Sequence, residues 1–504
     1  MNNFGRFSIV GAIFLFFFCT DSKTSKEDNK TQPPNIIYIL ADDLGFGDIQ
    51  FLNPESKYPT PNIDELARRG KSYTNFHTNS AVCTPTRYGI MTGRYAWRSS
   101  LKSGTLSSLQ PSIIDSGRKT VAHLLKENGY KTVAIGKWHL GMSIPMKDGE
   151  VDLSGEISNG PVDFGFEHYF GIPASLDLPP YFYINNKKIV EKPTVPGIGF
   201  GRKGLAAPSI KPENVLPELT QKAVQTIEEY AEENSKKPLF LYFPLTAPHT
   251  PVAPSEGFKG TTNSAYGDFI TQVDHVVGKI MKAISANNMN ENTLIIFTAD
   301  NGASPAAAKT AIANNHIPNN PFRGGKTLLW EGGHRVPFIA HWHNVIKSGT
   351  TSNDLFGTTD FMATVADILK VQLSENEGED SKSMLPSLIG NGSGRERYVY
   401  HSGSGFFAFT SGKYKLITVP GGGGWAETHF FGREFIPIDS TLNGQLYDIY
   451  KDPSETNNLY QIYPDIVDSL RKELKRVVLN GRSTTGNSKS KEFKYWDQLD
   501  TFWK

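Results

Sequence analysis

The chain has 504 residues, of which 38% are hydrophobic and 20% charged, and 52 basic and 51 acidic side chains give it a formal net charge of +1. This is the composition of an ordinary globular protein, and the length predicts two domains. The charge balance leaves no extended basic surface, so nucleic acid is not an expected partner, and any anionic substrate must be met by a local cluster of charge.

The N-terminal segment has the pattern of an export signal. Residues 7–18 are a mainly apolar run after Arg6 that is too short to cross a bilayer as a mature helix, so we interpret residues 1–18 as a signal peptide. Cys19 follows directly, and two outcomes stay open. Cleavage before it with lipid on its sulfur would anchor the protein to a membrane, whereas its removal would not. Residues 19–34 are polar and end in two prolines, which predicts a flexible tether.

Short β-branched apolar runs alternate with amphipathic stretches after the tether. The apolar runs suit strands buried on both faces of a parallel sheet, and they cover residues 35–40, 131–135, 239–243 and 293–298. The amphipathic stretches predict helices over 63–69, with Asn62 as N-cap, and over 121–128, 217–233 and 266–286. The alternation predicts an α/β fold with a large, mixed but mainly parallel sheet flanked by helices, over residues 35–390.

The pattern changes near residue 390. Short runs at 396–402, 406–410 and 414–419 predict antiparallel strands joined by glycine-rich turns, and the periodicity of 466–479 predicts a final helix. We therefore expect a smaller α+β domain over residues 391–504, packed on the large one.

Each of the four buried strands runs directly into polar residues. In chain order these are Asp42 and Asp43, then Lys137 with His139, then His249, and finally Asp300 and Asn301. Because open α/β sheets bind ligands at the carboxyl ends of their strands, we expect these side chains to gather at one edge.

Two of these groups offer only oxygen ligands. A single Asp-Asp pair is most often a helix cap or a turn. Adjacent carboxylates repel each other, however, and Asp42-Asp43 together with Asp300-Asn301 are best explained by a hard divalent cation, Ca²⁺ or Mg²⁺, between them.

Cys83 is the other distinctive residue. The chain has two cysteines, so without Cys19 no internal disulfide is possible. A small buried apolar residue is the ordinary interpretation of a free cysteine, but Pro85 and Arg87 follow it in Cys-Thr-Pro-Thr-Arg. This block resembles the Cys-x-Pro-Ser/Thr-Arg signature of the type I sulfatases, in which the cysteine is oxidised to formylglycine. Thr86 is a minor variant of that signature, so modification is still expected.

The other motifs match the same family in the same order. They are Gly136-Lys-Trp-His-Leu-Gly141, Ala247-Pro-His-Thr-Pro251, and residues 323–333, which carry Lys326. The resemblance covers most of residues 35–340 and implies an alkaline-phosphatase-like fold and hydrolysis of sulfate esters. It also implies one cation, Ca²⁺ rather than Mg²⁺.

The resemblance assigns a role to each matching residue. Asp42, Asp43, Asp300 and Asn301 would hold the cation, which the modified residue 83 would also contact. Arg87 and Lys137 would hold the hydrate of the formylglycine. Lys326 and His249 would bind sulfate and protonate the leaving oxygen, and His139 would be the base that later deprotonates the second hydroxyl of the hydrate. Ser175, in the shorter block 171–177, would contact substrate.

An exported sulfatase suits a bacterium that desulfates an external polysaccharide, with the enzyme in the periplasm or at the cell surface and a formylglycine-generating enzyme as maturation partner. Two alternatives remain. A phosphoesterase or phosphotransferase of the same superfamily would use Ser or Thr and usually two metals, and a non-catalytic carbohydrate-binding surface protein would lack at least one motif.

Specificity is expected from loops outside the motifs, at 142–215, 303–322 and 401–440. Candidates are His316 and His401 in these loops, His334 shortly after the second, and the aromatic residues Tyr181, Phe182, Tyr183, Phe406, Phe407 and Trp425.

Overall fold

The protein is described here by a computed structural model that covers residues 1–3, 5, 33–425, 438–489 and 493–503. Residues 33–504 form one compact unit. Most of the predicted signal peptide, Cys19 and most of the predicted tether lie outside the described residues. Within the described part of the chain, no helix is both long and apolar enough to cross a membrane.

A ten-stranded mixed sheet forms the centre of the fold. From one edge to the other it contains β15 (Thr350–Ser352), β2 (Lys71–Tyr73), β14 (Phe338–Trp342), β13 (Thr293–Ala299), β1 (Asn35–Asp42), β12 (Leu239–Pro248), β4 (Lys131–Lys137), β7 (His168–Ile172), β8 (Ile184–Asn185) and β9 (Lys188–Ile189). The five strands from β13 to β7 are parallel, and β14 and β8 are antiparallel to their inner neighbours.

The four predicted strands are the core of this sheet. In β1 every residue from Ile36 to Ala41 is at most 1% exposed, because helices cover both faces. Each of the four strands extends beyond its predicted end toward the polar residues, and Asp42 and Lys137 are themselves the last residues of β1 and β4. The predicted α/β class is therefore confirmed.

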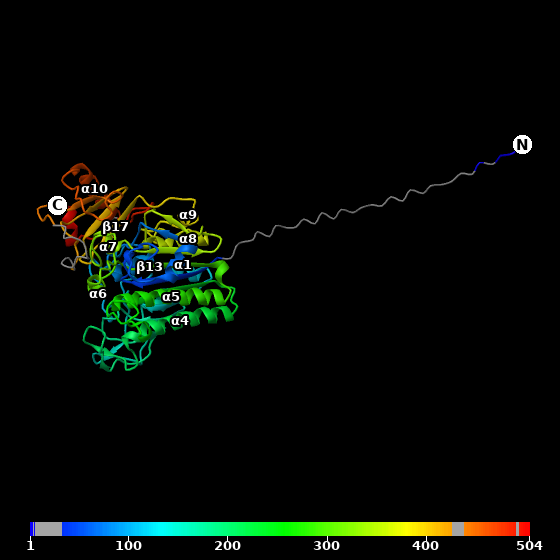
Figure 1. Cartoon of the computed structure of the whole chain (residues 1–504), viewed down its shortest axis with the longest axis horizontal. Helices are drawn as coiled ribbons and strands as arrows, with labels where there is room; N and C mark the ends of the chain where they lie inside the picture. The colour runs from blue at the N-terminus through cyan, green and yellow to red at the C-terminus, as the bar shows by residue number, and fades with distance from the viewer. Residues whose placement is uncertain (4, 6–32, 426–437, 490–492, 504) are drawn as a thin grey trace. The chain divides into compact units, whose positions relative to one another are not determined.

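Helices pack on both faces of the sheet. The longest are α4 (Pro212–Glu232) and α5 (Ala265–Ala286), which contact each other and β12. Figure 1 shows them on one side of the sheet, with α8 (Phe361–Leu369) and α9 (Leu385–Leu388) on the other. The remaining helices of this region are α1 (Pro61–Arg69), α2 (Cys83–Thr92), α3 (Val121–Glu127), α6 (Lys309–Ala313) and α7 (Glu331–His334).

Two helix starts differ from the prediction. Asn62 is not the N-cap of α1: the helix begins at Pro61, and Asp274 of α5 accepts hydrogen bonds from the backbone amides of Asn62 (2.9 Å) and Ile63 (2.8 Å). A carboxylate from a distant helix therefore satisfies the amides that a local cap would satisfy. α4 begins at Pro212 rather than Pro217, because a proline suits the first turn of a helix and Val215 and Leu216 extend its buried face.

The C-terminal region forms a four-stranded antiparallel sheet. Its strands are β17 (Arg397–His401), β18 (Phe407–Ser411), β19 (Tyr414–Ile417) and β20 (Gln445–Asp448), and α10 (Pro464–Asn480) packs against it. The first three strands and the helix match the prediction, whereas β20 was not predicted. The apolar core of this region also contains Trp97, Leu328 and Trp330 from the larger part of the chain. The domain boundary near residue 390 stays a prediction.

Candidate active site

The parallel strands bring the polar residues to one edge of the sheet. Asp42 ends β1, Lys137 ends β4, and His249 and Asp300 directly follow β12 and β13. Asp43 adopts a left-handed backbone conformation with φ of 63°, which turns the chain away from the strand. The gathering of these side chains, expected from the sequence, is observed.

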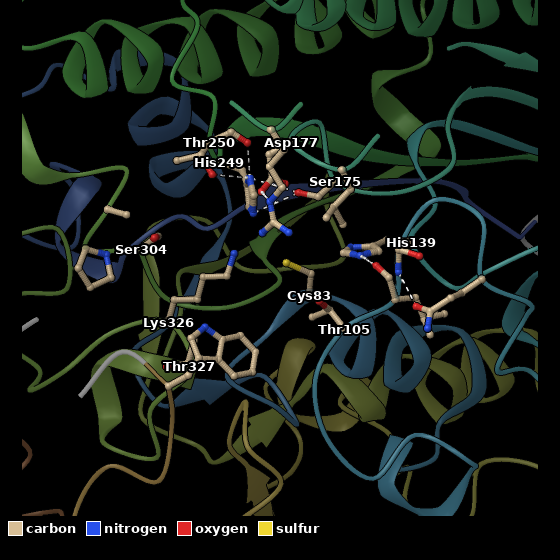
Figure 2. Close-up of a pocket in the computed structure, with 18 residues that line it drawn as sticks. Cys83, Thr105, His139, Ser175, Asp177, His249, Thr250, Ser304, Lys326 and Thr327 are labelled. Atoms are coloured by element: carbon tan, nitrogen blue, oxygen red, sulfur yellow. Dashed lines mark hydrogen bonds and ion pairs between the residues drawn. The ribbon is translucent and has the colours of Figure 1, made fainter. Parts of the chain in front are cut away.

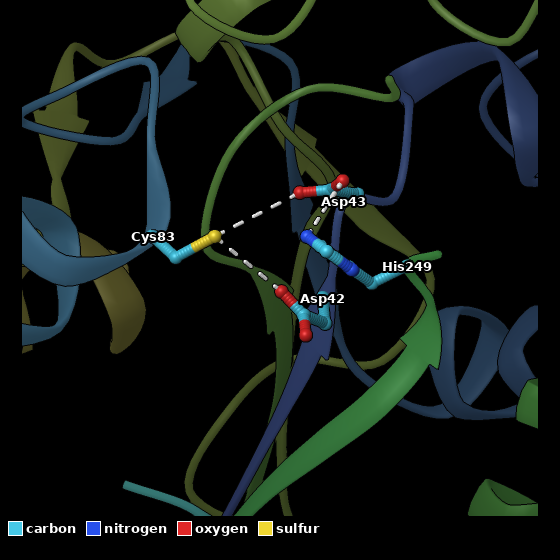
Figure 3. A group of neighbouring side chains, drawn as sticks. All are labelled: Asp42, Asp43, Cys83 and His249. Atoms are coloured by element: carbon cyan, nitrogen blue, oxygen red, sulfur yellow. Dashed lines mark hydrogen bonds and ion pairs between the residues drawn. The ribbon is translucent and has the colours of Figure 1, made fainter. Parts of the chain in front are cut away.

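Cys83 is the first residue of α2 and faces the two aspartates. Its Sγ lies 3.7 Å from Oδ1 of Asp42 and 3.9 Å from Oδ1 of Asp43 (Figure 3). The first amides of a helix have no acceptor within it, so α2 adds positive potential at residue 83. Burial, reinforced by the charge of Asp300, raises the pKa of the Cys83 thiol far above its usual range. The unmodified side chain is therefore a neutral thiol and a weak nucleophile.

Arg87, one turn further along α2, joins that helix to two strand ends. Its Nε and Nη2 donate to Oδ2 of Asp300 at 3.0 and 2.7 Å, and its Nη1 donates to the carbonyl of Lys137 at 2.8 Å. Both side chains of the Arg87–Asp300 pair are completely buried. Because a buried charge is costly without a partner, this pair fixes where α2 lies on the sheet.

Two lysines neutralise the other two carboxylates. Nζ of Lys137 donates to both oxygens of Asp42, at 2.9 and 2.8 Å, and Nζ of Lys326 donates to Oδ2 of Asp43 at 2.7 Å. Burial opposes the ionisation of Asp42, but Lys137, His249 and Arg87 outweigh it and hold the pKa of Asp42 well below its usual value. The site is therefore a compact array of buried, ionised groups.

The donor set fits a hard divalent cation. Asp42, Asp43, Cys83 and His249 each offer a ligand atom, and these atoms lie within 4.8 Å of one another (Figure 3). Asn301 donates from Nδ2 to Asp43 at 2.7 Å, while its own Oδ1 is buried and has no hydrogen-bond partner in the described part of the chain.

A buried carbonyl oxygen beside carboxylates is well suited to a cation that prefers oxygen. The oxygen ligands available are those predicted from the sequence: Asp42, Asp43, Asp300 and Asn301. Asp300 is the most constrained of them, because Oδ2 accepts from Arg87 and Oδ1 from the amide of Asp43 at 3.1 Å.

His139 is arranged as a base. Its Nε2 donates to the carbonyl of Leu106 at 2.8 Å, and its Nδ1 is buried without a partner among the described residues. Burial, together with the charges of Lys137 and Arg87, holds the pKa of His139 well below its usual value, so the ring is neutral at physiological pH. The proton on Nε2 leaves the lone pair on Nδ1, which can accept a proton.

His249 presents its other nitrogen to the site. Nδ1 donates to the carbonyl of Thr250 at 2.5 Å, which leaves Nε2, 3.6 Å from Oδ2 of Asp43, as the nitrogen that can exchange a proton with a substrate. Ser175 Oγ lies 3.2 Å from the His249 ring nitrogens and 3.4 Å from Nζ of Lys137. Ser175 therefore touches two of the groups expected to meet substrate.

A pocket of about 550 Å³ opens over these residues. In Figure 2, Lys326 and His249 lie on one side of Cys83 and His139 on the other. The sequence did not point to the segment 105–110, which supplies Thr105, Leu106, Ser107 and Gln110 to the lining. Its residues carry no motif and reach the pocket through tertiary packing alone.

Each of the three predicted specificity loops supplies some residues to the lining of the pocket. Asp177 and Arg202 come from the first loop and form an ion pair of 3.1 Å, residues 304–306 come from the second, and Trp425, 57% exposed, comes from the third. None of the three candidate histidines lines the pocket: His316, His334 and His401 are buried elsewhere. Of the candidate aromatic residues, Trp425 alone is among those that line it.

The loop that carries Lys326 is held by the C-terminal sheet. Nζ of Lys415, on β19, lies 2.8 Å from Glu331 Oε1, 2.9 Å from Glu455 Oε1 and 3.0 Å from His334 Nε2, and all four residues are fully buried. Glu331, His334 and nearby His77 offer ligand atoms that could hold a metal. The ammonium group of Lys415 already serves as their cation.

A mainly parallel sheet with a nucleophile position, buried cations and a candidate metal centre at its strand ends defines a hydrolase of the alkaline-phosphatase-like superfamily. The family model "Sulfatase" matches residues 34–371.

Relatives and solved structures give the same result. The chain is 32% identical to an N-acetylgalactosamine-6-O-sulfatase of Bacteroides thetaiotaomicron over 95% of this chain and 99% of that protein. It is 30% identical to arylsulfatase A of Bos taurus, over 89% and 87% of the two chains. A solved B. thetaiotaomicron sulfatase, described with the metabolism of multiple glycosaminoglycans, superposes with a TM-score of 0.79 at 31% identity, over 89% of this chain and 99% of that one.

The chain belongs to the sulfatase family and is a sulfuric ester hydrolase. This outcome confirms the resemblance seen in the sequence and favours it over the phosphoesterase and non-catalytic alternatives.

The contacts of Lys415 predict a role in positioning Lys326. Lys415→Met should lower kcat about tenfold or more, because the loss of its charge leaves Glu455 without its cation and Glu331 with Arg335 alone, and so loosens the loop that carries Lys326. Steady-state kinetics and thermal unfolding would measure both effects. The matched control is Lys413→Met, since Lys413 is half exposed and its only ion pair among the described residues is with Asp448 at 3.4 Å. Equal kcat for the two variants would contradict the positioning role.

Proposed function

We propose that this protein removes sulfate from a sulfated polysaccharide or its oligosaccharides, with a formylglycine made from Cys83 as nucleophile. The observation that carries the proposal is the setting of residue 83. It stands at a helix N-terminus, beside carboxylates that can hold a cation, and in a pocket that also contains Lys326, His249 and His139. Arg87, Lys137 and Lys326 balance the three carboxylates, so a bound cation would give the site a surplus of positive charge. A sulfate ester needs that surplus, because attack at sulfur spreads negative charge over its oxygens.

The substrate proposed for the first test is 6-O-sulfated N-acetylgalactosamine. Proteins named as N-acetylgalactosamine-6-sulfatases recur among the relatives, from B. thetaiotaomicron to Canis lupus familiaris, the latter 31% identical over 76% of this chain and 71% of that protein. The pocket has space for a sugar, and Asp177, Gln110 and Trp425 in its lining offer polar and aromatic contacts to the ring.

The reaction divides into two steps. One hydroxyl of the hydrated formylglycine would lose its proton to water, and the alkoxide, stabilised by Lys137 and Arg87, would attack sulfur. The bond from sulfur to the sugar oxygen would break, and that oxygen would take a proton from Nε2 of His249, which water later returns. Nδ1 of His139 then takes the proton of the second hydroxyl, the aldehyde re-forms, and sulfate leaves with the oxygen that attacked. Water adds to the aldehyde to restore the hydrate.

The basic residues carry the electrostatic part of this chemistry. Lys137 and Arg87 lie against the carboxylates beside residue 83 and stabilise the attacking oxygen. Lys326 lines the pocket and binds the sulfate oxygens as their charge grows. Asp42, Asp43, Asp300 and Asn301 would hold a divalent cation, which supplies Lewis-acid polarisation of the sulfate oxygens.

We propose Ca²⁺ as this cation, with Mg²⁺ the weaker candidate. Ca²⁺ accepts six to eight oxygen ligands in flexible geometry, whereas Mg²⁺ demands near-ideal octahedral geometry. A thiol sulfur is a soft ligand and matches neither ion. Conversion of Cys83 to a hydrated aldehyde would place oxygen at the same position, so the metal and the modification are consistent with each other.

The cellular setting completes the proposal. A signal peptide over residues 1–18 would export the protein to the periplasm or surface of a bacterium, with or without lipid on Cys19. A formylglycine-generating enzyme would have to act on Cys83 before folding, because the side chain is 1% exposed in the folded protein.

The modification and the activity can be tested together. Protein made with a maturation enzyme should release sulfate from N-acetylgalactosamine 6-sulfate, and mass analysis should show the Cys83 sulfur replaced by oxygen. Cys83→Ala should fold and lose turnover by at least about a thousandfold, since the covalent route is removed. The 4-sulfate isomer and N-acetylglucosamine 6-sulfate are the matched substrates. Full activity with an intact thiol would disprove the mechanism, and activity on none of a panel of sulfated sugars would disprove the function.

The metal prediction concerns Asn301. Asn301→Ala should weaken Ca²⁺ binding about tenfold or more, because it removes the unpartnered oxygen without disturbing the Arg87–Asp300 pair. Metal analysis after dialysis, and titration of chelator-treated protein with Ca²⁺ and Mg²⁺, would measure the change. Two tightly bound transition metals per chain, or unchanged Ca²⁺ affinity in the variant, would contradict the single-cation site.

The leaving-group prediction concerns His249. If its Nε2 protonates the departing oxygen, His249→Ala should slow desulfation of a sugar far more than hydrolysis of a nitrophenyl sulfate, because a sugar alkoxide is much more basic than a nitrophenolate. Lys137→Ala should slow both substrates, since it acts on the nucleophile. Equal losses on both substrates for His249→Ala would exclude the general-acid role and leave His249 as a sulfate-binding group.

A further inference from the structure

A second cleft, outside the catalytic pocket, is lined by a cluster of basic side chains. It has a volume of about 410 Å³ and is formed by the segment after α2 and the C-terminal part of the chain. Five basic residues and one acidic residue line it: Arg94, Arg98, Lys102, Lys489, Lys494 and Asp115. We call it the Lys102 cleft. None of these residues belongs to the catalytic site.

The positive charge of the Lys102 cleft is only partly compensated. Arg94 and Arg98 have acidic partners, Glu379 at 3.5 Å and Asp380 at 2.8 Å. Nζ of Lys102 instead donates to the carbonyl of Trp97 at 2.5 Å and lies 4.3 Å from the ring centroid of Trp496. Lys102 and Lys494 form no ion pair with a carboxylate in the described part of the chain.

The neighbouring positive charges act on the pKa of Lys102. Partial burial, reinforced by Arg94, Arg98 and Lys494, lowers the pKa of Lys102 to about 8. Like charges that share a partly buried space destabilise one another, and a bound anion would remove that cost.

One residue that lines the same cleft carries a buried hydrogen-bond donor without an acceptor. Trp97 lines it and is 2% exposed, and its indole Nε1 has no acceptor among the described residues. A buried N–H without a partner costs about 1–3 kcal/mol. Within the part of the chain that the structure describes, the N–H of Trp97 has no acceptor, and the ammonium group of Lys102 has a backbone carbonyl but no anion as its partner. A sulfate or carboxylate group offers anionic oxygens.

We propose that the Lys102 cleft binds a sulfate or carboxylate group on an acidic glycan, at a position outside the catalytic pocket. The proposal rests on the proposed function in that it takes the glycan to be the substrate. Lys102 is three residues from Thr105, which lines the catalytic pocket, so their Cα atoms are at most about 11 Å apart. An oligosaccharide longer than one sugar can therefore reach from one site toward the other.

Binding measurements test the cleft directly. In a Cys83→Ala background, which cannot turn over, a sulfated hexasaccharide containing uronic acids should bind about tenfold more weakly to Lys102→Met/Lys494→Gln than to the parent. The matched control is Lys279→Gln/Lys282→Gln, which removes two exposed charges from α5. The same hexasaccharide without its sulfates identifies the group that is bound. If Lys102→Met/Lys494→Gln still weakens its binding, the bound group is a carboxylate; if the substitutions no longer affect its binding, the bound group is a sulfate.

Kinetics separate this proposal from the proposed function. In the active enzyme, Lys102→Met/Lys494→Gln should raise KM for the hexasaccharide about tenfold and leave kcat and KM for a monosulfated monosaccharide unchanged, which also shows that the variant folds. Hexasaccharide binding equal to that of the control pair overturns the cleft proposal. If the parent enzyme desulfates no glycan but the Cys83→Ala protein still binds the hexasaccharide through Lys102, the substrate assignment fails and the cleft stands.

Discussion

Three carboxylates are buried together at the edge of the sheet, and the rest of the site depends on how each is neutralised. Arg87 pairs with Asp300, Lys137 with Asp42, and Lys326 with Asp43. A buried charge without its partner costs several kcal/mol. This cost fixes the positions of α2, of the end of β4 and of the loop around residue 326 relative to β1 and β13.

The same pairs connect stability with chemistry. Lys326, which neutralises Asp43, lines the pocket, and Lys137, which neutralises Asp42, contacts Ser175 in its lining. Two of the groups that hold the fold together thus also place positive charge at the pocket. The two histidines are oriented by backbone carbonyls, His139 through Leu106 and His249 through Thr250. Each therefore has one nitrogen fixed and one available, which makes a base and an acid possible in one site.

The C-terminal sheet is part of this arrangement. Lys415 of β19 neutralises Glu331 and Glu455, and Gln445 of β20 accepts from the indole of Trp330 at 3.0 Å. Both contacts hold the segment that carries Lys326. A region that the sequence suggested as a separate domain thus supports Lys326, a side chain that lines the pocket in the larger part of the chain.

The sequence by itself determined the strands of the parallel core, the polar residues that follow them, and the residues of the sulfatase motifs. These features depend on local periodicity and on short spacings, which a single segment carries. Tertiary structure decided which charges pair: Arg87 and Asp300 are 213 residues apart, and Lys415 and Glu331 are 84 apart.

Tertiary structure also decided that His316, His334 and His401 are buried away from the pocket, that residues 105–110 line it, and that Asp274 caps α1. The physical reason is the same in each case. The burial and pairing of a side chain depend on which distant segments pack against it. A local pattern of polar and apolar residues does not specify those segments.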